Sequence, residues 1–437
     1  MKVELLSPAG SPEKLRYALA YGADAVYAGI PRFSLRARQN GFRDESLRQA
    51  IAYAHGLGKK IYITANILPP NRKIGSFQKS LATYAEAGAD AFIMSDPGLI
   101  RFALREFPQV PVHLSVQTNT MNWMTVAFWH DLGVRRTILS RELSLEEIRE
   151  IHEKVPGMEL EAFVHGSICI AYSGRCLLSN YFNHRDANQG TCTNSCRWDY
   201  NIYKAEDAAP HPPAGSLLPA EGEFYIEETS RPGQLMPIDE DEHGTYIMNS
   251  RDLRAMEWLT DLRGAGVLSF KIEGRSKSVY YLSRVTRAYR RAMDDLAAGR
   301  PLDPSNLEET DKTANRGFTS AFLVSSANRA TERFDSPQED RLPQTFAGQV
   351  VGQRSGGWME VEIKNQVRAG DTLEYLSPAR QHRFILEEME NARGVPLDIA
   401  HGGNGTVWIR MEGEETGTFA LLSRVEASHP AVASRPM

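Results

Sequence analysis

The sequence repeats one short pattern, in which a helical stretch closes on glycine and an apolar segment follows at once. The pattern is clearest at 20–29 (AYGADAVYAG), 86–96 (EAGADAFIMSD), 130–140 (HDLGVRRTILS) and 263–274 (RGAGVLSFKIEG). Similar apolar segments follow helical stretches at 59–66, 111–119 and 158–166, and one more opens the chain. Glycine ends a helix because it adopts the left-handed conformation at little cost, and a short apolar run is typical of a buried parallel strand. The sequence therefore predicts eight βα units.

Eight repeated βα units are typical of a TIM-type barrel, in which parallel strands close into a ring inside a ring of helices. The alternative is an open Rossmann-like sheet, which carries a G-x-G-x-x-G turn after its first strand. The corresponding turn here reads SPAGSPEK (7–14) and lacks that spacing. The pattern favours the α/β barrel.

Two stretches depart from the repeat. An interruption with a Pro-rich loop and strand-like pieces comes first, and a polar, proline-broken stretch with one helix expected at 305–323 comes later. After that the hydrophobic period changes to two, which indicates short antiparallel strands separated by turns. We therefore expect a TIM-type barrel over 1–299 with an insertion at about 167–250, a connector over 300–344 and a small β-barrel domain over 345–425.

All four cysteines lie in the insertion, within a window of 28 residues. They are Cys169, Cys176, Cys192 and Cys196, with the spacing C-x6-C-x15-C-x3-C. In a reducing compartment, clustered cysteines are more often metal ligands than structural disulfides. The first two directly follow the predicted strand at 158–166, and the working residues of TIM barrels lie on the loops after the strands. The sequence therefore predicts a four-thiolate metal site at the barrel mouth.

The spacing of the thiols leaves two metals open. Structural zinc sites usually pair cysteines with about two to four residues between them. Cys192 and Cys196 satisfy that rule, whereas Cys169 and Cys176 do not. Iron–sulfur clusters take four thiolates from irregular loops. The spacing favours an iron–sulfur cluster over zinc, and unliganded thiols are the remaining alternative.

Other polar residues at predicted strand ends are expected at the same mouth. They are Asn66, Asp96, Gln117, Asn119, Arg141, His165, Asn249, Lys271, Glu273 and Arg275. Lys271, Glu273 and Arg275 alternate on one face of an otherwise apolar strand, and a buried charge needs a partner or a function. We take His165, Lys271 and Glu273 as candidate catalytic residues. A salt-bridge ladder among the three charged residues is the structural alternative.

The charge of the chain is unevenly distributed. The net charge is −5, but the stretch 204–244 alone carries −8, so the rest of the chain carries +3. A phosphate-binding face is therefore permitted, and a neutral enzyme with one acidic loop is the equal alternative. No signal peptide and no long apolar span is evident in the sequence, so we expect a cytoplasmic protein without a membrane partner.

The motifs of common hydrolases are missing from the sequence. It contains no G-x-S-x-G elbow. His152 and Glu153 would begin an H-E-x-x-H zinc motif, but Pro156 stands where the second histidine should be. A cysteine nucleophile near His165 would leave three thiols unexplained. The residues therefore do not support a protease.

Four long segments resemble a known family. Residues 161–179 (EAFVHGSICIAYSGRCLLS) resemble the signature of the collagenase-like peptidase family of unassigned class, number thirty-two (U32). The segments NHRDANQGTCTNSCRW (183–198), DEHGTYIMNSRDLRA (241–255) and FKIEGRSKS (270–278) are similar to its tRNA-modifying branch. The resemblance covers most of the chain.

The resemblance implies a reaction. Members of that branch hydroxylate the wobble uridine of tRNA to 5-hydroxyuridine without molecular oxygen. They use prephenate as co-substrate and depend on the iron–sulfur assembly machinery, which implies a 4Fe–4S cluster and an electron donor of unknown identity. By position, Cys169, Cys176 and Cys192 match the family's cysteines. In some relatives the fourth ligand lies further downstream, where this chain has no cysteine. Either Cys196 is the fourth ligand here, or the cluster has a non-cysteine or labile fourth site.

Prephenate carries two carboxylates, which guanidinium groups bind in a bidentate geometry. The arginines near the predicted mouth are candidate clamps, namely Arg36, Arg38, Arg141 and Arg275. A solvated basic loop or a tRNA phosphate contact is the alternative for the first two. Two other functions stay open for the chain: a collagenase-like peptidase, and a non-catalytic RNA-binding or cluster protein.

Overall fold

The fold is that of a computed structural model of the chain. It describes residues 3–37, 40–168, 251–324, 342–403, 405–411 and 417–426, together with the backbone of three short strands between residues 224 and 246. These residues form two compact units. All four cysteines, Arg38 and Asn249 lie outside the described residues.

The first unit contains a closed barrel of eight parallel strands. They are β1 (Glu4–Ala9), β2 (Ala25–Gly29), β3 (Lys60–Ala65), β4 (Ala91–Met94), β5 (Val112–Leu114), β6 (Arg136–Ile138), β7 (Glu159–Ser167) and β12 (Val267–Ile272). Consecutive strands pair in parallel, and β12 closes the ring by pairing with both β7 and β1. The strands are almost wholly buried, as near-continuous apolar runs require. The predicted TIM-type barrel is confirmed.

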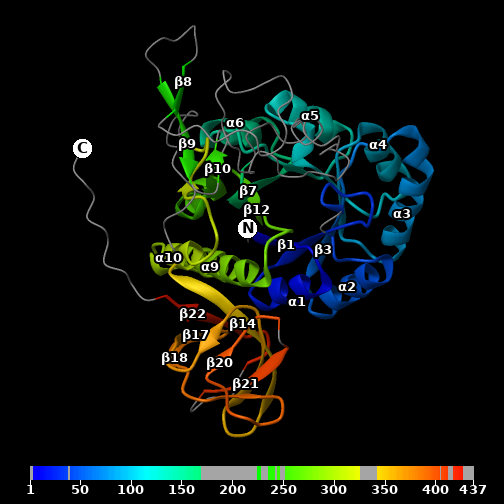
Figure 1. Ribbon diagram of the computed structural model, residues 1–437. Helices are drawn as coiled ribbons and strands as arrows, with labels where there is room; N and C mark the ends of the chain where they lie inside the picture. The colour runs from blue at the N-terminus through cyan, green and yellow to red at the C-terminus, as the bar shows by residue number, and fades with distance from the viewer. Residues whose placement is uncertain are drawn as a thin grey trace, which may run out of the picture. The chain divides into compact units, whose positions relative to one another are not determined.

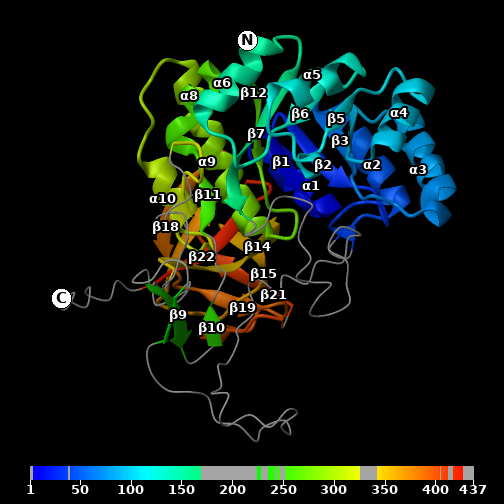
Figure 2. The ribbon, with the colours of Figure 1, turned by 90° about the horizontal axis from the view of Figure 1, so that it is seen from above.

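Helices connect the strands around the barrel. They are α1 (Pro12–Ala20), α2 (Asp44–Gly56), α3 (Ile74–Glu86), α4 (Pro97–Glu106), α5 (Trp123–Asp131), α6 (Leu145–Lys154) and α8 (Leu259–Gly264). Figure 1 looks along the barrel and shows α2 to α6 arranged around the strands, and Figure 2 shows the strands side by side after a 90° turn. In the described part of the chain, no helix is long and apolar enough to cross a bilayer.

The glycines of the sequence repeat mark the turns into the strands. Gly22, Gly88, Gly133 and Gly266 have φ angles of 107°, 87°, 100° and 92°. A residue with a Cβ atom is strained at such angles, so glycine is the residue that lets the chain leave a helix and enter the next strand in few steps. The repeat was therefore a reliable guide to where the strands begin.

The sheet continues beyond the barrel at one point. β11 (Asp252–Arg254) pairs antiparallel with the end of β7, and β13 (Phe318–Thr319) pairs in parallel with β11. The helix expected at 305–323 is therefore wrong in its second half, because α10 spans only Ser305–Asp311. Gly317 turns the chain with φ of 73°, and the backbone of Phe318 then pairs with β11 instead of continuing a helix. Three short antiparallel strands lie within 224–246, namely β8 (Phe224–Glu227), β9 (Leu235–Asp241) and β10 (Gly244–Tyr246).

The second unit contains a mostly antiparallel sheet domain. Its main sheet has the order β18-β17-β22-β14-β15-β21-β19, and β16 (Val367–Arg368) pairs separately with β20 (Ile399–Ala400). The seven strands are β14 (Gln344–Arg354), β15 (Trp358–Ile363), β17 (Thr372–Leu376), β18 (Gln381–Ile385), β19 (Met389–Asn391), β21 (Thr406–Arg410) and β22 (Leu421–Val425). Alternate residues such as Met359, Val361 and Ile363 face one apolar core. The predicted period of two is confirmed, and the small β-domain with it.

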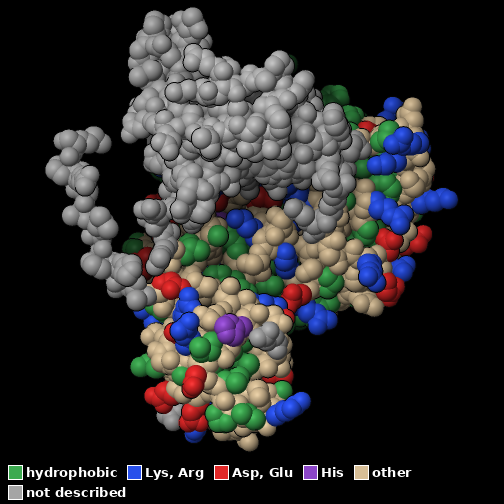
Figure 3. Space-filling view, viewed as in Figure 1, with side chains coloured by type: hydrophobic (Ala, Val, Ile, Leu, Met, Phe, Trp, Pro, Cys, Tyr) green, Lys and Arg blue, Asp and Glu red, His purple; other side chains and the backbone are tan. Residues whose placement is uncertain are grey.

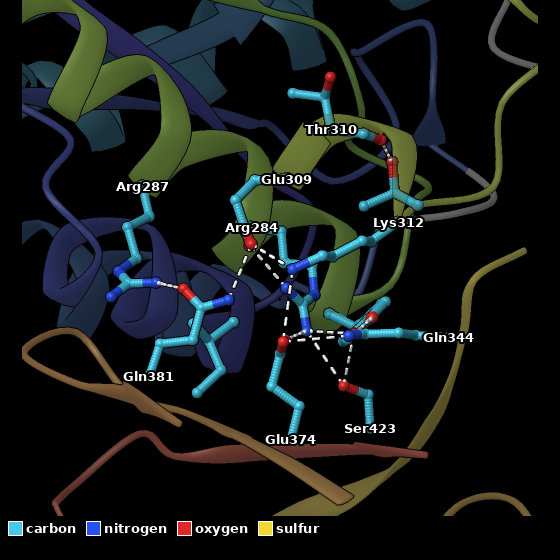
Figure 4. A network of polar contacts seen from close by, with 12 residues as sticks. Arg284, Arg287, Glu309, Thr310, Lys312, Gln344, Glu374, Gln381 and Ser423 are labelled. Carbon is cyan, nitrogen blue, oxygen red and sulfur yellow. Dashed lines mark hydrogen bonds and ion pairs between the residues drawn. The ribbon is translucent and has the colours of Figure 1, made fainter. Parts of the chain in front are cut away.

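The helices α9 (Val279–Ala297) and α10 belong to the same unit as this sheet. Arg284 of α9 is fully buried, and Figure 4 shows it among acidic and polar side chains of α10 and the sheet. Its Nη1 donates to Glu309 Oε2 at 2.6 Å, and its Nη2 contacts Glu374 Oε1 at 2.5 Å and Ser423 Oγ at 3.0 Å. Gln344 joins the group through Glu374 Oε2 at 3.0 Å. One guanidinium thus ties two helices and three strands together.

Candidate functional site

The cysteine-bearing segment leaves and rejoins the barrel at the mouth. Its two ends are neighbours, because Ser167 at the end of β7 pairs with Asp252 at the start of β11. Arg316 Nη2 holds the carboxylate of Asp252 at 2.6 Å, which fixes the returning strand. The carboxyl ends of barrel strands are where catalytic residues gather. The segment therefore starts where the sequence predicts, while the arrangement of its cysteines lies outside the described residues.

A buried ion pair lies inside the barrel, between Lys271 of β12 and Glu161 of β7. Lys271 Nζ donates to Glu161 Oε1 at 2.6 Å, and the two side chains are 4% and 0% exposed. Glu161 Oε2 also accepts from Arg136 Nη1 of β6 at 3.1 Å. Burial by itself raises the pKa of Glu161, but the charges of Lys271 and Arg136 outweigh it and hold that pKa below its usual value. Lys271 is thus neutralised by another strand, not by the ladder along its own.

A second layer of polar contacts lies nearer the amino ends of the strands. Arg136 Nη1 donates to Glu4 Oε1 at 2.7 Å, and Arg136 Nη2 lies 2.9 Å from Glu159 Oε2. Tyr62 and Ser269 donate to the Glu4 carboxylate at 2.6 and 2.9 Å. Each charge in this layer has a partner of opposite sign, so its role is to hold the strands together.

At the mouth, Glu273 faces three arginines. It follows β12, and the Tyr27 hydroxyl of β2 donates to Glu273 Oε2 at 3.1 Å. Burial raises the pKa of Glu273, but neighbouring cations outweigh it. In order of decreasing influence they are Arg36, Arg275 and Arg141, and they hold the pKa of Glu273 below its usual value. Three of the four predicted carboxylate clamps therefore lie around this one acidic group.

Two of these arginines are fixed by aromatic rings. The Arg275 guanidinium lies 5.7 Å from the centre of the Tyr27 ring, and the Arg141 guanidinium lies 3.8 Å from that of Phe163. A Cβ atom on Gly29 would come within 2.9 Å of Arg275 Nη1, so the glycine makes room for this guanidinium. The Nε atoms of Arg141 and Arg275 are buried without a hydrogen-bond partner in the described part of the chain. Such oriented cationic donors suit an anionic ligand.

His165 lies beside this group, within β7. Its backbone carbonyl accepts the N–H of Glu273 at 2.8 Å, and its ring lies 5.3 Å from that of Phe318. Arg254 of β11 pairs with His165 in the sheet, and the Arg254 guanidinium lies 4.6 Å from the centre of the Phe318 ring. The structure therefore brings His165 and Glu273 together through the backbone, and their catalytic roles stay predictions.

The polar residues after β3, β4 and β5 divide into two kinds. Asp96 caps α4, because its Oδ1 accepts the N–H of Leu99 at 3.0 Å. Asn66 and Gln117 instead join a row of hydrogen bonds at the mouth through Ser115, at 3.3 and 3.1 Å. The expectation that polar residues at strand ends lie at the mouth (the strand-end rule) therefore found both a helix cap and residues that line the mouth.

The rim of the mouth carries exposed cations. Arg32 after β2 and Arg72 after β3 are exposed, and Lys73 is half-buried. The two loops are held together because the Phe33 ring packs 5.1 Å from the Phe77 ring of α3. Figure 3 shows Lys and Arg side chains gathered over the part of this face where α3 and α4 lie. The rim therefore offers positive charge to an approaching polyanion.

Comparison with known proteins places the chain in a family. The family model described as "Peptidase family U32" matches residues 10–333, and the model described as "Peptidase family U32 C-terminal domain" matches residues 343–422. The chain belongs to peptidase family U32. Both units of the chain are thus accounted for by one family, as the resemblance of the sequence predicts.

Several relatives of this U32 protein carry names that refer to RNA. It is 49% identical over 438 residues to tRNA hydroxylation protein P of Escherichia coli (strain K12), covering 97% of each chain. The protein of that name from Haemophilus influenzae is 45% identical, covering 97% of this chain and 96% of the relative. The 23S rRNA 5-hydroxycytidine C2501 synthase of Escherichia coli is 31% identical, covering 86% of this chain and 52% of the relative.

Sequence reasoning missed the internal partners in this U32 barrel. Glu161 compensates the charges of Lys271 and Arg136 inside the barrel, and the Tyr27 hydroxyl donates to Glu273. The signal for the two charged residues was present, because each stands in an apolar strand segment (MELEAFVHG and GVRRTIL). Applying the rule used for Lys271 to every strand would have found both. Tyr27 gave no such signal, since a tyrosine in a strand is ordinary.

Proposed function

We propose that this protein is a tRNA-modifying enzyme that hydroxylates wobble uridine to 5-hydroxyuridine, with prephenate as co-substrate and an iron–sulfur cluster at the barrel mouth. The observation that carries the proposal is the match with tRNA hydroxylation protein P over 97% of both chains. The mouth geometry is compatible with that reaction, because three arginines act on Glu273, whose backbone N–H bonds to His165 two residues before the end of β7.

The arginine group supports an anionic co-substrate. Arg141 and Arg275 present buried Nε donors without partners among the described residues, next to a single neutralising carboxylate on Glu273. Guanidinium groups bind carboxylates strongly when the site is shielded from water. A dicarboxylate such as prephenate would accept hydrogen bonds from these Nε donors.

The rim supports tRNA as the second substrate. A wobble uridine lies unstacked in a single-stranded loop, so its base can enter a recessed site while the flanking phosphates stay outside. Arg32, Arg72 and Lys73 are placed to meet such phosphates.

The four thiols of the insertion would hold the cluster. Cys169, Cys176, Cys192 and Cys196 form a donor set of the kind that iron–sulfur clusters require. Bound there, a cluster supplies one-electron redox chemistry, while the residues of the barrel bind and orient the substrates. The ends of the insertion at Ser167 and Asp252 support a position at the mouth.

The decisive experiment is nucleoside mass spectrometry of bulk tRNA from a strain without 5-hydroxyuridine synthesis. Expressing this chain is expected to restore 5-hydroxyuridine, and Cys169→Ser is expected to abolish it. Anaerobically purified protein should show the visible absorption of an iron–sulfur cluster. Absence of 5-hydroxyuridine with the intact chain overturns the proposal, and colourless protein loaded with zinc overturns the cluster. A peptidase would instead show proteolysis that survives Cys169→Ser.

Arg275→Gln is expected to weaken prephenate binding about tenfold or more, because one hydrogen bond to a charged group contributes about 1.5–3 kcal/mol. Isothermal titration calorimetry of the purified protein with prephenate measures the change. Arg48→Gln is the matched control, since Arg48 is exposed on α2 and pairs with Glu45 on the same helix. Equal affinities for both variants and wild type would remove Arg275 from the co-substrate site.

A further inference from the structure

A row of uncharged side chains crosses the mouth at the ends of β3, β4 and β5. Asn66, Ser95 and Ser115 are buried, and Gln117 is half-buried in the turn that follows β5. The row carries no formal charge and contains none of the arginines around Glu273. A ligand group that meets it would therefore be recognised by hydrogen bonds and not by charge.

The directions of these hydrogen bonds are fixed from one end. The backbone N–H of Leu35 can only donate, and it donates to Asn66 Oδ1 at 3.2 Å. The other amide atom of Asn66, Nδ2, must then be the donor to Ser115 Oγ at 3.3 Å. Since Ser115 Oγ accepts this bond, its own hydrogen is free to go to Gln117 Oε1 at 3.1 Å.

The orientation of the Gln117 amide follows from this order. Its oxygen accepts from Ser115 and also from Ser95 Oγ at 3.0 Å, which is closer than the Asn66 carbonyl, the other acceptor of the Ser95 hydroxyl, at 3.3 Å. Two hydroxyl donors on one amide oxygen leave its NH2 group directed away from the row. This nitrogen has no hydrogen-bond partner in the part of the chain that the structure describes, so two oriented N–H donors are available.

The backbone holds the donor group in place. Gln117 lies in a single 3-10 turn (Val116–Thr118), which begins at Ser115. The Thr118 hydroxyl donates to the Ser115 carbonyl at 2.9 Å, and the chain leaves the turn through Asn119 with φ of 50°. A side chain whose backbone and amide oxygen are already fixed loses little conformational entropy on binding. Such a side chain is suited to discriminate between ligands.

We propose that Gln117 Nε2 donates a hydrogen bond to the carbonyl oxygen at position 4 of a uracil base, and so selects uracil over cytosine. This inference rests on the proposed function. Uracil carries an acceptor oxygen at position 4, whereas cytosine carries an NH2 donor there. Two donors that face each other leave both unpaired, so cytosine is rejected without any steric clash.

The test uses the full-length protein and two anticodon stem–loop RNAs that differ only in U or C at the wobble position. Fluorescence anisotropy is expected to show about tenfold tighter binding of the U hairpin to wild type. Gln117→Glu keeps the oxygen that Ser95 and Ser115 hold and replaces the NH2 group with an acceptor. The preference is expected to reverse towards C, because a carboxylate accepts from the cytosine amino group.

Two further variants control the result. Gln109→Glu makes the same change at an exposed residue before β5, at the opposite end of the strand, and should keep the preference of wild type. Gln117→Met keeps the approximate size without the donor and should bind both hairpins equally. If Gln117→Glu and Gln117→Met both discriminate as wild type does, the role of Gln117 is overturned and the proposed function stands. If wild type binds neither hairpin, the proposed function fails and this inference with it.

Discussion

Glu161→Gln is expected to lower the free energy of unfolding by about 3–5 kcal/mol, because removing one partner of a buried ion pair leaves the other without compensation. Glu161 is fully buried between Lys271 and Arg136. Arg136 keeps Glu4 and Glu159, so Lys271 bears most of the loss. Urea unfolding of the full chain at pH 7 measures the change.

The matched control for this variant lies two residues earlier on the same strand. Glu159 is partly exposed and pairs with Arg135 and Arg136 at the barrel end. Because Arg136 keeps Glu4 and Glu161 as partners, Glu159→Gln is expected to cost about 1 kcal/mol or less. Because the pKa of Glu161 is below its unfolded value, its ion pairs stabilise the fold above about pH 4.3 and lose that effect as the pH falls. The difference between wild type and Glu161→Gln should therefore shrink in acid. Equal costs for the two variants at pH 7 would contradict the prediction.

Arg284→Met is expected to lower the free energy of unfolding by a similar amount, about 3–5 kcal/mol. It would leave the buried carboxylate of Glu374, which is 3% exposed, and that of Glu309 with Lys312 as their shared cation. Chemical denaturation followed by circular dichroism measures the change. Arg291→Met on the same helix is the control, since Arg291 is exposed and its loss should cost about 0.5 kcal/mol or less. A cost for Arg284→Met as small as that of Arg291→Met would contradict the assignment.

The same cluster predicts a pH dependence. Burial raises the pKa of Glu374, but the charge and hydrogen bond of Arg284 outweigh it and hold the pKa at about 2. A carboxylate whose pKa is lowered by folding stabilises the fold at pH values above its pKa in the unfolded state. This stability is lost as the pH falls towards the pKa in the folded state. Wild type should therefore lose about 3 kcal/mol from this group between roughly pH 5 and pH 2. Arg284→Met should lose less over that range, because its Glu374 lacks the guanidinium.

The fold was largely predictable because its signals are local. A short apolar run after each helical stretch, marked by a glycine at four of the turns, placed seven later strands correctly behind the first, and the period of two placed the C-terminal sheet. The helix expected at 305–323 failed where a long-range contact intervened. Phe318 pairs with Asp252, and that strand pairing overrides the helical pattern of the segment.

The candidate site was predictable only in part. The strand-end rule found Glu273, Arg141, Arg275 and Gln117, because in a parallel barrel every strand ends at the same rim. It could not separate Asp96, which caps a helix, from Gln117, which faces the mouth. That distinction depends on hydrogen bonds between neighbouring loops, and sequence spacing does not contain them.

The sequence by itself determined the barrel, the β-domain and the position of the cysteine-bearing segment after β7, since hydrophobic period and turn residues act over a few neighbours along the chain. Only the tertiary structure decided which charges are already neutralised. Lys271 meets Glu161 across 110 residues of chain and is held inside the barrel, whereas the predicted clamps Arg36, Arg141 and Arg275 gather around Glu273 from three separate segments. Closing the barrel sets these partners, because it brings strands that are far apart in sequence to face one another across a single interior.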